Sequence, residues 1–384
     1  MGSTPHKKII CITNDFGPRA GGIESFVIGL LERTPRNSVI VYTSYQRDSE
    51  EYDRKWLDDY GIEVIRDRSK ILLPTPRVAR AVQALVHERG ITVALFGAAA
   101  PLGLLSHAIR SAGITRIVAL THGHEVWWSK IWPFSWALKR IGNGVDTLTY
   151  LGEFTRRAIA RSLSEKSAQA MVRIAPGIDT SHFAPQVNLE SLRSELDLDG
   201  KRVIVSVGRL VHRKGQDTLV KALPEILAEY PDVHLVFIGV GPHLEYIHKR
   251  AIQLGVLNHI SFLGRARYQE LPRLISLGEI FAMPSRSRFG GLEVEGLGIV
   301  YLEASACGLP IVGGIAGGAP DALIEGETGF AVDARSASEV ARVIKILLHD
   351  PVRAAAMGER GRVWIKQEWQ WQRWSAELNK LLGI

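Results

Sequence analysis

Two carboxylates lie eight positions apart in the segment Glu295-Gly-Leu-Gly-Ile-Val-Tyr-Leu-Glu303. A glycine-bearing loop runs into an apolar, helix-forming stretch here, so one carboxylate belongs to a loop and the other to a helix. This placement suits a ligand with two hydroxyl-rich parts. Metal binding is a poor alternative, because no His or Cys lies nearby at the spacing of metal ligands. We therefore expect no metal.

Two cations lie five positions apart in the loop Val207-Gly-Arg-Leu-Val-His-Arg-Lys-Gly-Gln216, directly after an apolar strand. Arg209 and Lys214 suit a diphosphate, whose negative charge must be neutralised as it departs as a leaving group. The alternative is that both cations serve solubility alone.

A glycine-rich loop, Gly17-Pro-Arg-Ala-Gly-Gly22, follows the first predicted strand. Glycines let backbone N–H groups approach a phosphate, and the helix that follows adds its positive N-terminal end. The dinucleotide pattern G-x-G-x-x-G is absent here, and Gly239-Val-Gly241 has Leu244 in place of the third glycine, so a nicotinamide enzyme is disfavoured. The alternative is a tight turn without a ligand.

Two histidines lie in the segment Thr121-His-Gly-His-Glu125, at the end of another predicted strand. His122 is a candidate hydrogen-bond partner for a substrate hydroxyl. For His124 we favour a structural role.

The composition is that of an ordinary folded protein, with 384 residues, 46% of them hydrophobic and 23% charged. The length suits two domains, and the composition argues against a disordered, collagenous or coiled-coil chain. Cys11 and Cys307 are too few for a disulfide framework, which favours a reducing cytoplasm. The best membrane-helix candidate, residues 91–105, is shorter than the roughly 20 apolar residues that a span needs. We expect a cytoplasmic protein.

Apolar strand candidates alternate with helical segments along the whole chain. In the first half the predicted strands are residues 8–13, 38–42, 62–65, 93–96, 117–121 and 146–150, with helices such as 23–31 and 76–88 between them. In the second half the alternating segments are residues 202–207, 216–229, 233–238, 243–253, 260–262, 271–276, 280–283, 302–307 and 311–313. Such alternation predicts an α/β protein with two doubly wound parallel sheets and a ligand in the cleft between them.

The segment Ala175-Pro-Gly-Ile-Asp179 is the expected hinge. We place an N-terminal domain at residues 1–180, a C-terminal domain at 181–365, and a last helix at 366–384 that returns to the first domain. A returning helix would bury the tryptophans of the C-terminal group, which are Trp364, Trp369, Trp371 and Trp374.

The net charge of +7 belongs to the first half, because residues 1–183 hold 24 Lys and Arg against 17 Asp and Glu, whereas residues 184–384 hold 23 of each. A basic half suggests nucleic acid, an anionic membrane surface or a phosphorylated ligand as partner, and solubility is the alternative. The chain has no recognisable nucleic-acid module, so we expect no nucleic-acid partner.

A second group of tryptophans is mixed with cations, a combination that suits a membrane interface, although the rings could instead pack between domains. The expected lipid-contact residues are Trp127, Trp128, Lys130, Trp132, Trp136, Lys139 and Arg140, together with Arg66, Arg68, Lys70, Arg77 and Arg80.

The E-x7-E segment, the following Ala-Ser-Ala-Cys-Gly-Leu-Pro-Ile and Gly317-Gly-Ala-Pro320 resemble the family-4 group of retaining GT-B glycosyltransferases. The segments VGRLVHRKG, FLGR and MPSRSR fit the same family, and the resemblance covers about residues 8–375. FGAAAPLGLL, ALTHGHEVWW and SRSRFGGLEVEGLGIVYLEA resemble bacterial GDP-mannose-dependent phosphatidylinositol monomannoside mannosyltransferases. The resemblance implies a GT-B fold, in which two Rossmann-like domains face a central cleft. Phe289 departs from the usual pattern, where Gly or a polar residue is common, and could alter sugar preference.

The resemblance also implies a role for each candidate residue. Gly21 and Gly22 would donate backbone N–H groups to the diphosphate, which Arg209 and Lys214 would clamp. Glu303 would bind the ribose. The remaining residues implied by the resemblance are Glu295 with Gly296, Leu297 and Gly298 for the donor sugar, His122 for its outer hydroxyls, and Gly264 with Arg265 for the base.

The implied reaction is retaining transfer of mannose from GDP-mannose to a phosphatidylinositol mannoside through an α-1,6 linkage. No metal or other cofactor is implied, and the departing phosphate would deprotonate the acceptor hydroxyl on the front face. The implied location is the inner face of the cell membrane, as a peripheral protein. Two alternatives stay open: a related enzyme that uses a UDP-sugar and another lipid or a polyol, and a catalytically silent nucleotide- or lipid-binding protein.

Overall fold

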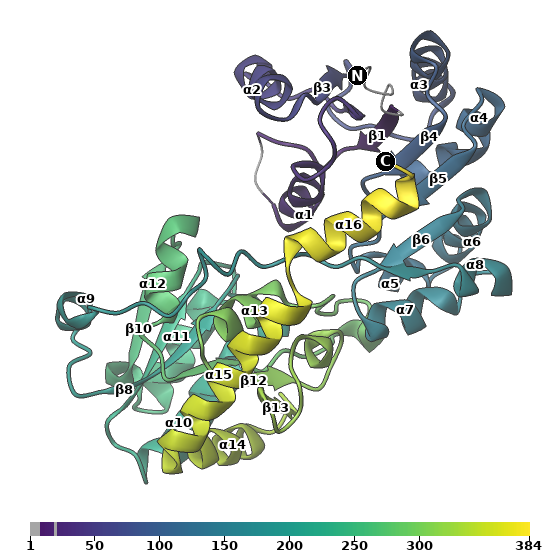
Figure 1. Cartoon of the computed structure of the whole chain (residues 1–384). Helices are drawn as coiled ribbons and strands as arrows, with labels where there is room; N and C mark the ends of the chain where they lie inside the picture. Colours follow the sequence, from purple (N-terminus) through teal and green to yellow (C-terminus); the bar gives the residue numbers. More distant parts are fainter. Residues whose placement is uncertain (1–7, 19–20) are drawn as a thin grey trace. The chain divides into compact units, whose positions relative to one another are not determined.

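Two parallel β-sheets form the framework of the chain (Figure 1). The structure is a computed structural model that describes residues 8–18 and 21–384. Each sheet belongs to its own compact unit: unit 1 comprises residues 1–177 and 371–384, and unit 2 comprises residues 178–370. The predicted boundaries, after residues 180 and 365, differ slightly from these. The N–H of Ile178 donates to the carbonyl of Trp369 at 2.7 Å, which joins the two connecting segments to each other.

Unit 1 has a seven-stranded sheet in the order β3-β2-β1-β4-β5-β6-β7. Its strands are β1 (Ile9–Thr13), β2 (Val39–Thr43), β3 (Glu63–Arg66), β4 (Val93–Phe96), β5 (Arg116–Ala119), β6 (Thr147–Tyr150) and β7 (Val172–Arg173). Its helices are α1 (Gly22–Leu31), α2 (Glu50–Tyr60), α3 (Pro76–Arg89), α4 (Ser106–Ser111), α5 (Glu125–Trp128), α6 (Phe134–Gly144), α7 (Glu153–Ala160), α8 (Glu165–Gln169) and α16 (Trp371–Leu382).

Unit 2 has a six-stranded sheet in the order β10-β9-β8-β11-β12-β13. Its strands are β8 (Arg202–Val207), β9 (Val233–Ile238), β10 (Ile260–Gly264), β11 (Ile280–Met283), β12 (Ile311–Gly314) and β13 (Gly329–Val332). Its helices are α9 (Glu190–Glu195), α10 (Gln216–Leu227), α11 (Leu244–Gln253), α12 (Leu271–Ile275), α13 (Ile299–Ala306), α14 (Ala337–His349) and α15 (Pro351–Glu368).

The sequence explains why these segments form the central strands. All five residues of β1 are buried, as are all four of β4, because helices cover both faces of a parallel sheet and leave no polar side to the strand. The predicted alternation of strands and helices is confirmed in both halves. Several predicted segments begin one residue away from the observed ones, and one differs by three: the helix expected at residues 302–307 is α13, which starts at Ile299 because Gly298 adopts a left-handed conformation (φ 82°) at its N-cap.

The last helix, α16, packs within unit 1. Gly29 of α1 has no side chain, so the ring of Trp371 can lie against it, and Trp374 is 4% exposed with Arg173 over its ring at 5.3 Å. The other two tryptophans of the C-terminal group belong to unit 2, where the ring of Trp364 meets that of Trp369 edge-on at 5.5 Å. The group therefore divides between the two units.

Candidate functional site

The loop after β8 brings two cations to one carboxylate in unit 2. Nζ of Lys214 lies 2.7 Å from Oε2 of Glu295, and Nη1 of Arg213 bonds to the same oxygen. The pair is largely shielded from water, because Lys214 and Glu295 are each 8% exposed. Burial alone would raise the pKa of Glu295, but the two cations outweigh it, so the pKa lies below its usual value. Glu295 is therefore an anion at neutral pH.

Only part of this cluster was predicted from the sequence. Arg209 is exposed and, within the described part of the chain, enters no ion pair, whereas Arg213 was not predicted. Arg213 also approaches Glu293 at 3.8 Å, and Glu293 pairs with Arg288 at 3.2 Å. The run His212-Arg-Lys214 is the sequence feature that could have indicated Arg213. Three adjacent basic residues, however, do not reveal which of them faces the carboxylate.

The chain turns sharply on both sides of this cluster. Gly215 has φ 75°, and a Cβ there would collide with the carbonyl of Pro284, so only glycine lets α10 start so close to Lys214. Gly298 has φ 82°, and a Cβ there would collide with the ring of Tyr301. Gly215 and Gly298 are the N-cap residues of α10 and α13, so they fix where these two helices begin.

The backbone between the two carboxylates presents donors. Within the described structure, the N–H groups of Gly296, Leu297 and Gly298 reach no acceptor, although Leu297 and Gly298 are buried. Gly318 donates to the carbonyl of Glu295 at 2.8 Å, which holds the segment in place. Buried N–H groups are rarely left unpaired, so these groups can donate hydrogen bonds to a ligand oxygen.

Glu303 lies on α13, half-buried, and its carboxylate forms no hydrogen bond with any described residue. Burial raises its pKa to about 7, and the positive charge of Lys214 offsets part of that rise. A carboxylate in this condition gains from a ligand that donates hydrogen bonds to it, such as a diol.

The loop after β10 was predicted to carry the base. Gly264 ends β10 with φ 72°, and its carbonyl accepts from Gly239 at 2.7 Å. Arg265 follows as an exposed side chain. Both residues therefore lie at the carboxyl edge of the sheet of unit 2, as do the loops that follow β8 and β11.

In unit 1 the first predicted loop leads into α1. Gly21 is its N-cap, and a Cβ on Gly22 would meet nothing within 4 Å, so packing inside the protein does not demand glycine there. Arg19 and Ala20 of the same loop lie outside the described residues.

His122 lies past the carboxyl end of β5, with its ring edge-on to Phe26 at 5.4 Å. Its Nε2 bonds to the carbonyl of Gly97 at 2.5 Å, so Nε2 carries the proton, and burial lowers the pKa of the ring. The neutral ring then presents Nδ1 as an acceptor, which suits a substrate hydroxyl. His124 instead lies 3.2 Å from the buried Glu125 and 3.3 Å from the carbonyl of Ala100, which fits a structural role.

The expected lipid-contact residues need two corrections. The side chain of Arg66 is only 9% exposed and forks onto Asp53, with both bonds at 2.7 Å. Arg77 forks onto Asp67 in the same way, at 2.8 and 2.9 Å. Both arginines hold structure together because a carboxylate distant in sequence reaches them. Arg68, Lys70 and Arg80 are exposed.

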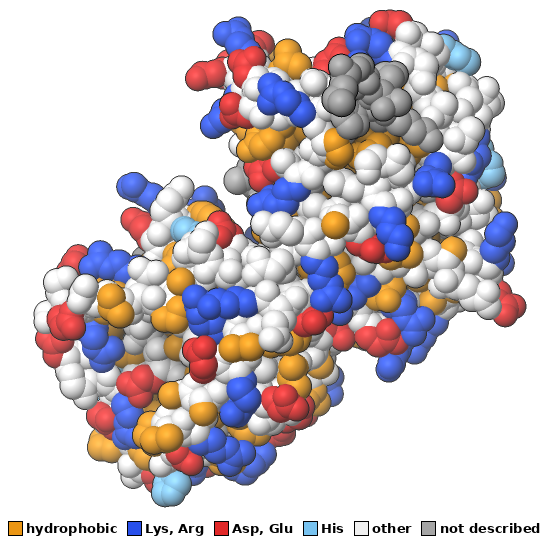
Figure 2. Space-filling model, in the orientation of Figure 1, with side chains coloured by type: hydrophobic (Ala, Val, Ile, Leu, Met, Phe, Trp, Pro, Cys, Tyr) orange, Lys and Arg blue, Asp and Glu red, His pale blue; other side chains and the backbone are white. Residues whose placement is uncertain are grey.

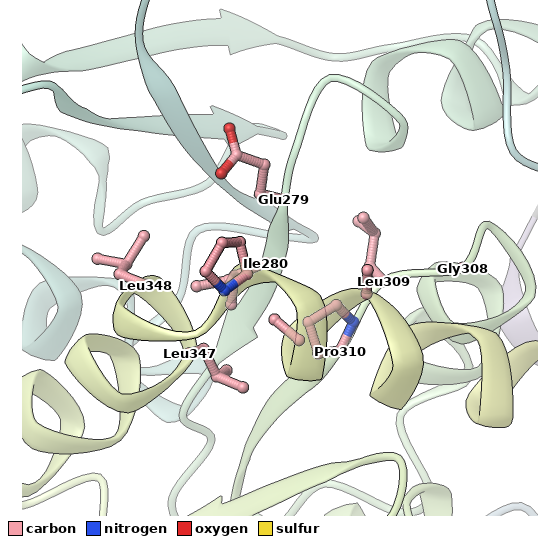
Figure 3. Close-up of a pocket in the computed structure, with 10 residues that line it drawn as sticks. Glu279, Ile280, Gly308, Leu309, Pro310, Leu347 and Leu348 are labelled. Atoms are coloured by element: carbon pink, nitrogen blue, oxygen red, sulfur yellow. The ribbon is translucent and has the colours of Figure 1, made fainter.

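A cavity of about 220 Å³ lies at the other edge of the sheet of unit 2. It is lined by the start of β11, the residues before β12, the end of α14 and the start of α15 (Figure 3). Figure 3 shows the carboxylate of Glu279 directed away from Leu347 and Leu309. The cavity is mainly apolar and lies at the amino ends of the strands, so it is separate from the Lys214–Glu295 cluster.

Within residues 8–18 and 21–384, no three His, Cys, Asp or Glu side chains come together in a way that could hold a metal ion. None of the helices in the same ranges has the length and apolar character that crossing a membrane requires.

Comparisons with known proteins agree on one family. Residues 20–182 match the model of Glycosyltransferase Family 4, and residues 189–364 match that of Glycosyl transferases group 1. A protein of Mycolicibacterium smegmatis, named GDP-mannose-dependent alpha-(1-6)-phosphatidylinositol monomannoside mannosyltransferase, is 43% identical over 98% of both chains. A protein of Corynebacterium glutamicum, named for the monoacylated form of the same acceptor, is 38% identical over 98% of both.

Solved structures share the fold. HepE of Anabaena in complex with UDP matches with a TM-score of 0.81 and 18% identity, covering 98% of this chain and 99% of that one. Sucrose-phosphate synthase of Thermosynechococcus elongatus matches with a TM-score of 0.76 and 20% identity, covering 98% of both. The expected fold class, two Rossmann-like domains of the GT-B type, is thereby confirmed. The chain belongs to the group 1 family of glycosyltransferases.

Proposed function

We propose that the chain transfers mannose from GDP-mannose to a phosphatidylinositol mannoside, with retention of the anomeric configuration. The observation that carries this proposal is the 43% identity over 98% of both chains to a relative named for that donor and acceptor. The candidate residues present a chemistry that suits it, because cations, backbone donors and carboxylates gather in unit 2.

Lys214 and Arg209 are proposed to neutralise the diphosphate as its bond to the sugar breaks. Charge develops on the leaving oxygen at that moment, and a preorganised cation stabilises it most where water is excluded. The burial of Lys214 supports this role. Arg209 is exposed, so it can neutralise the diphosphate only if its side chain moves toward the bound ligand. With this positive charge supplied by side chains, we propose that transfer requires no metal ion, so treatment with EDTA leaves turnover unchanged.

The remaining groups are proposed to hold the donor. Glu295, with the N–H groups of Gly296, Leu297 and Gly298, binds hydroxyls of the sugar, and Glu303 binds the ribose diol. Gly264 and Arg265 border the base. In unit 1, Gly21 and Gly22 donate to the diphosphate, and Nδ1 of His122 accepts from an outer hydroxyl of the sugar. The departing phosphate takes the proton of the acceptor hydroxyl.

We further propose that unit 1 meets its lipid acceptor at the inner surface of the cell membrane. Lys and Arg side chains are scattered among acidic and apolar ones on the face drawn in Figure 2, so the surplus charge is dispersed there. The segments after β3 and β5 supply a sharper feature, because each exposes two large apolar side chains. These are Ile71 (64%) and Leu73 (52%), and Trp132 (80%) and Trp136 (58%).

The segment after β3 is held with its apolar side chains outward. Leu72 is fully buried, and its N–H and C=O bond to the side chain of Asn14 at 2.7 and 3.0 Å. With Leu72 held inward in this way, its neighbours Ile71 and Leu73 project to solvent. Arg68, Lys70 and Arg80 are exposed nearby in the sequence, and apolar tips with cations suit an anionic bilayer.

Transfer of label from radioactive GDP-mannose into an organic-extractable product, with phosphatidylinositol monomannoside as acceptor, tests the reaction. We expect labelled lipid with the wild type and none with Glu295→Gln. GDP should also raise the melting temperature more than UDP does, because a ligand stabilises the state that binds it. Transfer from a UDP-sugar but not from GDP-mannose would replace the proposed donor.

A further inference from the structure

The side chain of Arg286, in the loop after β11, lies at the centre of a polar cluster beside the cationic loop. Its Nε donates to Nδ1 of His212 at 3.1 Å, Nη1 to Oγ1 of Thr218 at 2.8 Å, and Nη2 to Oδ1 of Asp217 at 2.6 Å. Its backbone N–H also donates to the carbonyl of Arg213 at 2.8 Å. Arg286 thus bonds to residues on both sides of Lys214.

This cluster is buried and well bonded. The side chains of Arg286 and Asp217 are 11% and 2% exposed. Burial would raise the pKa of Asp217, but the charges of Arg286 and Lys221 outweigh it and hold the pKa below its usual value. Thr218 extends the network, because its hydroxyl accepts from Arg286 and donates to the carbonyl of Ala334 at 2.7 Å. A buried network with satisfied partners is rigid.

We propose that Arg286 and Asp217 are positioning residues for catalysis: their ion pair, together with the bonds of Arg286 to His212 and to the carbonyl of Arg213, fixes residues 211–215 so that Lys214 and Arg213 meet Glu295. Lysine has a long flexible side chain, so the location of its backbone decides where the ammonium group can act. A misplacement of about 1 Å costs on the order of a hundredfold in rate. This inference rests on the proposed function, which assigns Lys214 and Glu295 to the donor.

A purely structural ion pair is the competing explanation, and unit 2 contains a matched control. Arg202 forks onto Asp232 with bonds of 2.6 and 2.7 Å, at the amino end of β8 and therefore at the opposite edge of the same sheet. Arg202→Gln breaks this fork without touching the cationic loop.

The experiment compares wild type with Arg286→Gln, Arg286→Lys, the double variant Arg286→Gln/Asp217→Asn, and Arg202→Gln. The melting temperature, GDP affinity, kcat and the hydrogen exchange of residues 211–218 are measured for each, below the melting temperature of the least stable variant. We expect Arg286→Gln to lower kcat about tenfold to a hundredfold, to weaken GDP binding and to speed exchange in residues 211–218. Arg202→Gln should lower the melting temperature but leave kcat, GDP affinity and that exchange unchanged.

Two variants distinguish an effect on the position of residues 211–215 from an effect on the stability of the protein. Arg286→Gln leaves Asp217 with Lys221, at 3.2 Å, as its one salt-bridge partner from Lys or Arg among the described residues. The double variant also removes the charge of Asp217, so it should recover melting temperature relative to Arg286→Gln while kcat stays low. Lysine at position 286 keeps the charge but cannot bond to His212, Asp217 and Thr218 together, so kcat should also stay low. Wild-type kcat and wild-type exchange in either variant would overturn the proposal. If the wild type transfers no mannose from GDP-mannose, the proposed function fails. The hydrogen exchange of residues 211–218 and the GDP affinity then still decide whether Arg286 and Asp217 position residues 211–215.

Discussion

Nζ of Lys214 lies 2.7 Å from Oε2 of Glu295, and the two side chains come from loops that are separated by eighty residues of sequence. The loop after β8 supplies the cation and the segment before α13 supplies the carboxylate. Because both loops lie at the carboxyl edge of one sheet, the fold of unit 2 alone assembles this pair.

Lys214→Ala should raise the activation free energy of transfer by roughly 2–4 kcal/mol, as removal of other preorganised charge-stabilising groups does. The measurement is kcat at saturating donor. Lys345→Ala is the control, because Lys345 also pairs with a carboxylate, Glu229 at 2.7 Å, but on the surface. Near-normal turnover of Lys214→Ala would show that the diphosphate binds elsewhere.

Glu303 should make stability depend on pH. Its pKa is about 7 in the folded chain, against 4.5 for an ordinary carboxyl, so between these values the folded state holds a proton that the unfolded state releases. The stabilisation from that proton is present below about pH 4.5 and is lost as pH rises through 7, a cost of up to about 3 kcal/mol. Glu303→Gln removes this dependence. In urea unfolding from pH 5 to 8, the free energy of unfolding of the variant should therefore rise relative to that of the wild type. Parallel curves would contradict the prediction.

Gln216 is a buried amide whose two polar atoms find no partner among the described residues. Gln216→Met keeps a similar shape and removes the unpaired groups, so it should stabilise the chain by about 1–2 kcal/mol. The melting temperature and urea midpoint measure the effect. Gln253→Met, at an exposed position, should change stability by less than about 0.5 kcal/mol. A less stable Gln216→Met would mean that bound water satisfies the amide.

Ile71→Ser/Leu73→Ser should weaken binding to vesicles that contain anionic phospholipid. Each exposed side chain of this size contributes about 1.5–3 kcal/mol when it leaves water, so vesicle affinity should fall about tenfold or more. Val352→Ser is the control, because Val352 is 79% exposed on α15 of unit 2. Flotation assays compare the proteins, with Trp132→Ser/Trp136→Ser as a second test. A wild type without preference for anionic lipid would refute the proposed contact.

Strands were the most predictable part of the fold. The observed bounds of β4, β8, β9 and β11 equal the predicted ones, because each strand is a mainly apolar run that ends directly before Gly or Pro. Glu295, Glu303 and Lys214 could likewise be named from sequence, since motif spacing identifies them without coordinates.

Side-chain partners were not predictable. Arg66 and Arg77 were expected on a contact surface, but Asp53 and Asp67 hold them, and nothing in the local sequence announces these pairs. The same is true of Arg213 and Arg286, whose partners are brought near by the sheet topology. The backbone conformation of Phe289 was not predictable either. Its φ is 50°, which bulky residues rarely adopt, and its side chain is 68% exposed.

Because α16 belongs to unit 1, that unit is encoded in two separate stretches, residues 1–177 and 371–384, with the whole of unit 2 inserted between them. A ribosome therefore releases every residue of unit 2 before it releases the helix that carries Trp371 and Trp374. Unit 2 can complete its core without α16, whereas unit 1 keeps an open site over Gly29 until α16 docks. A released chain that stops at residue 370 should accordingly contain a protease-resistant unit 2 and an unfinished unit 1.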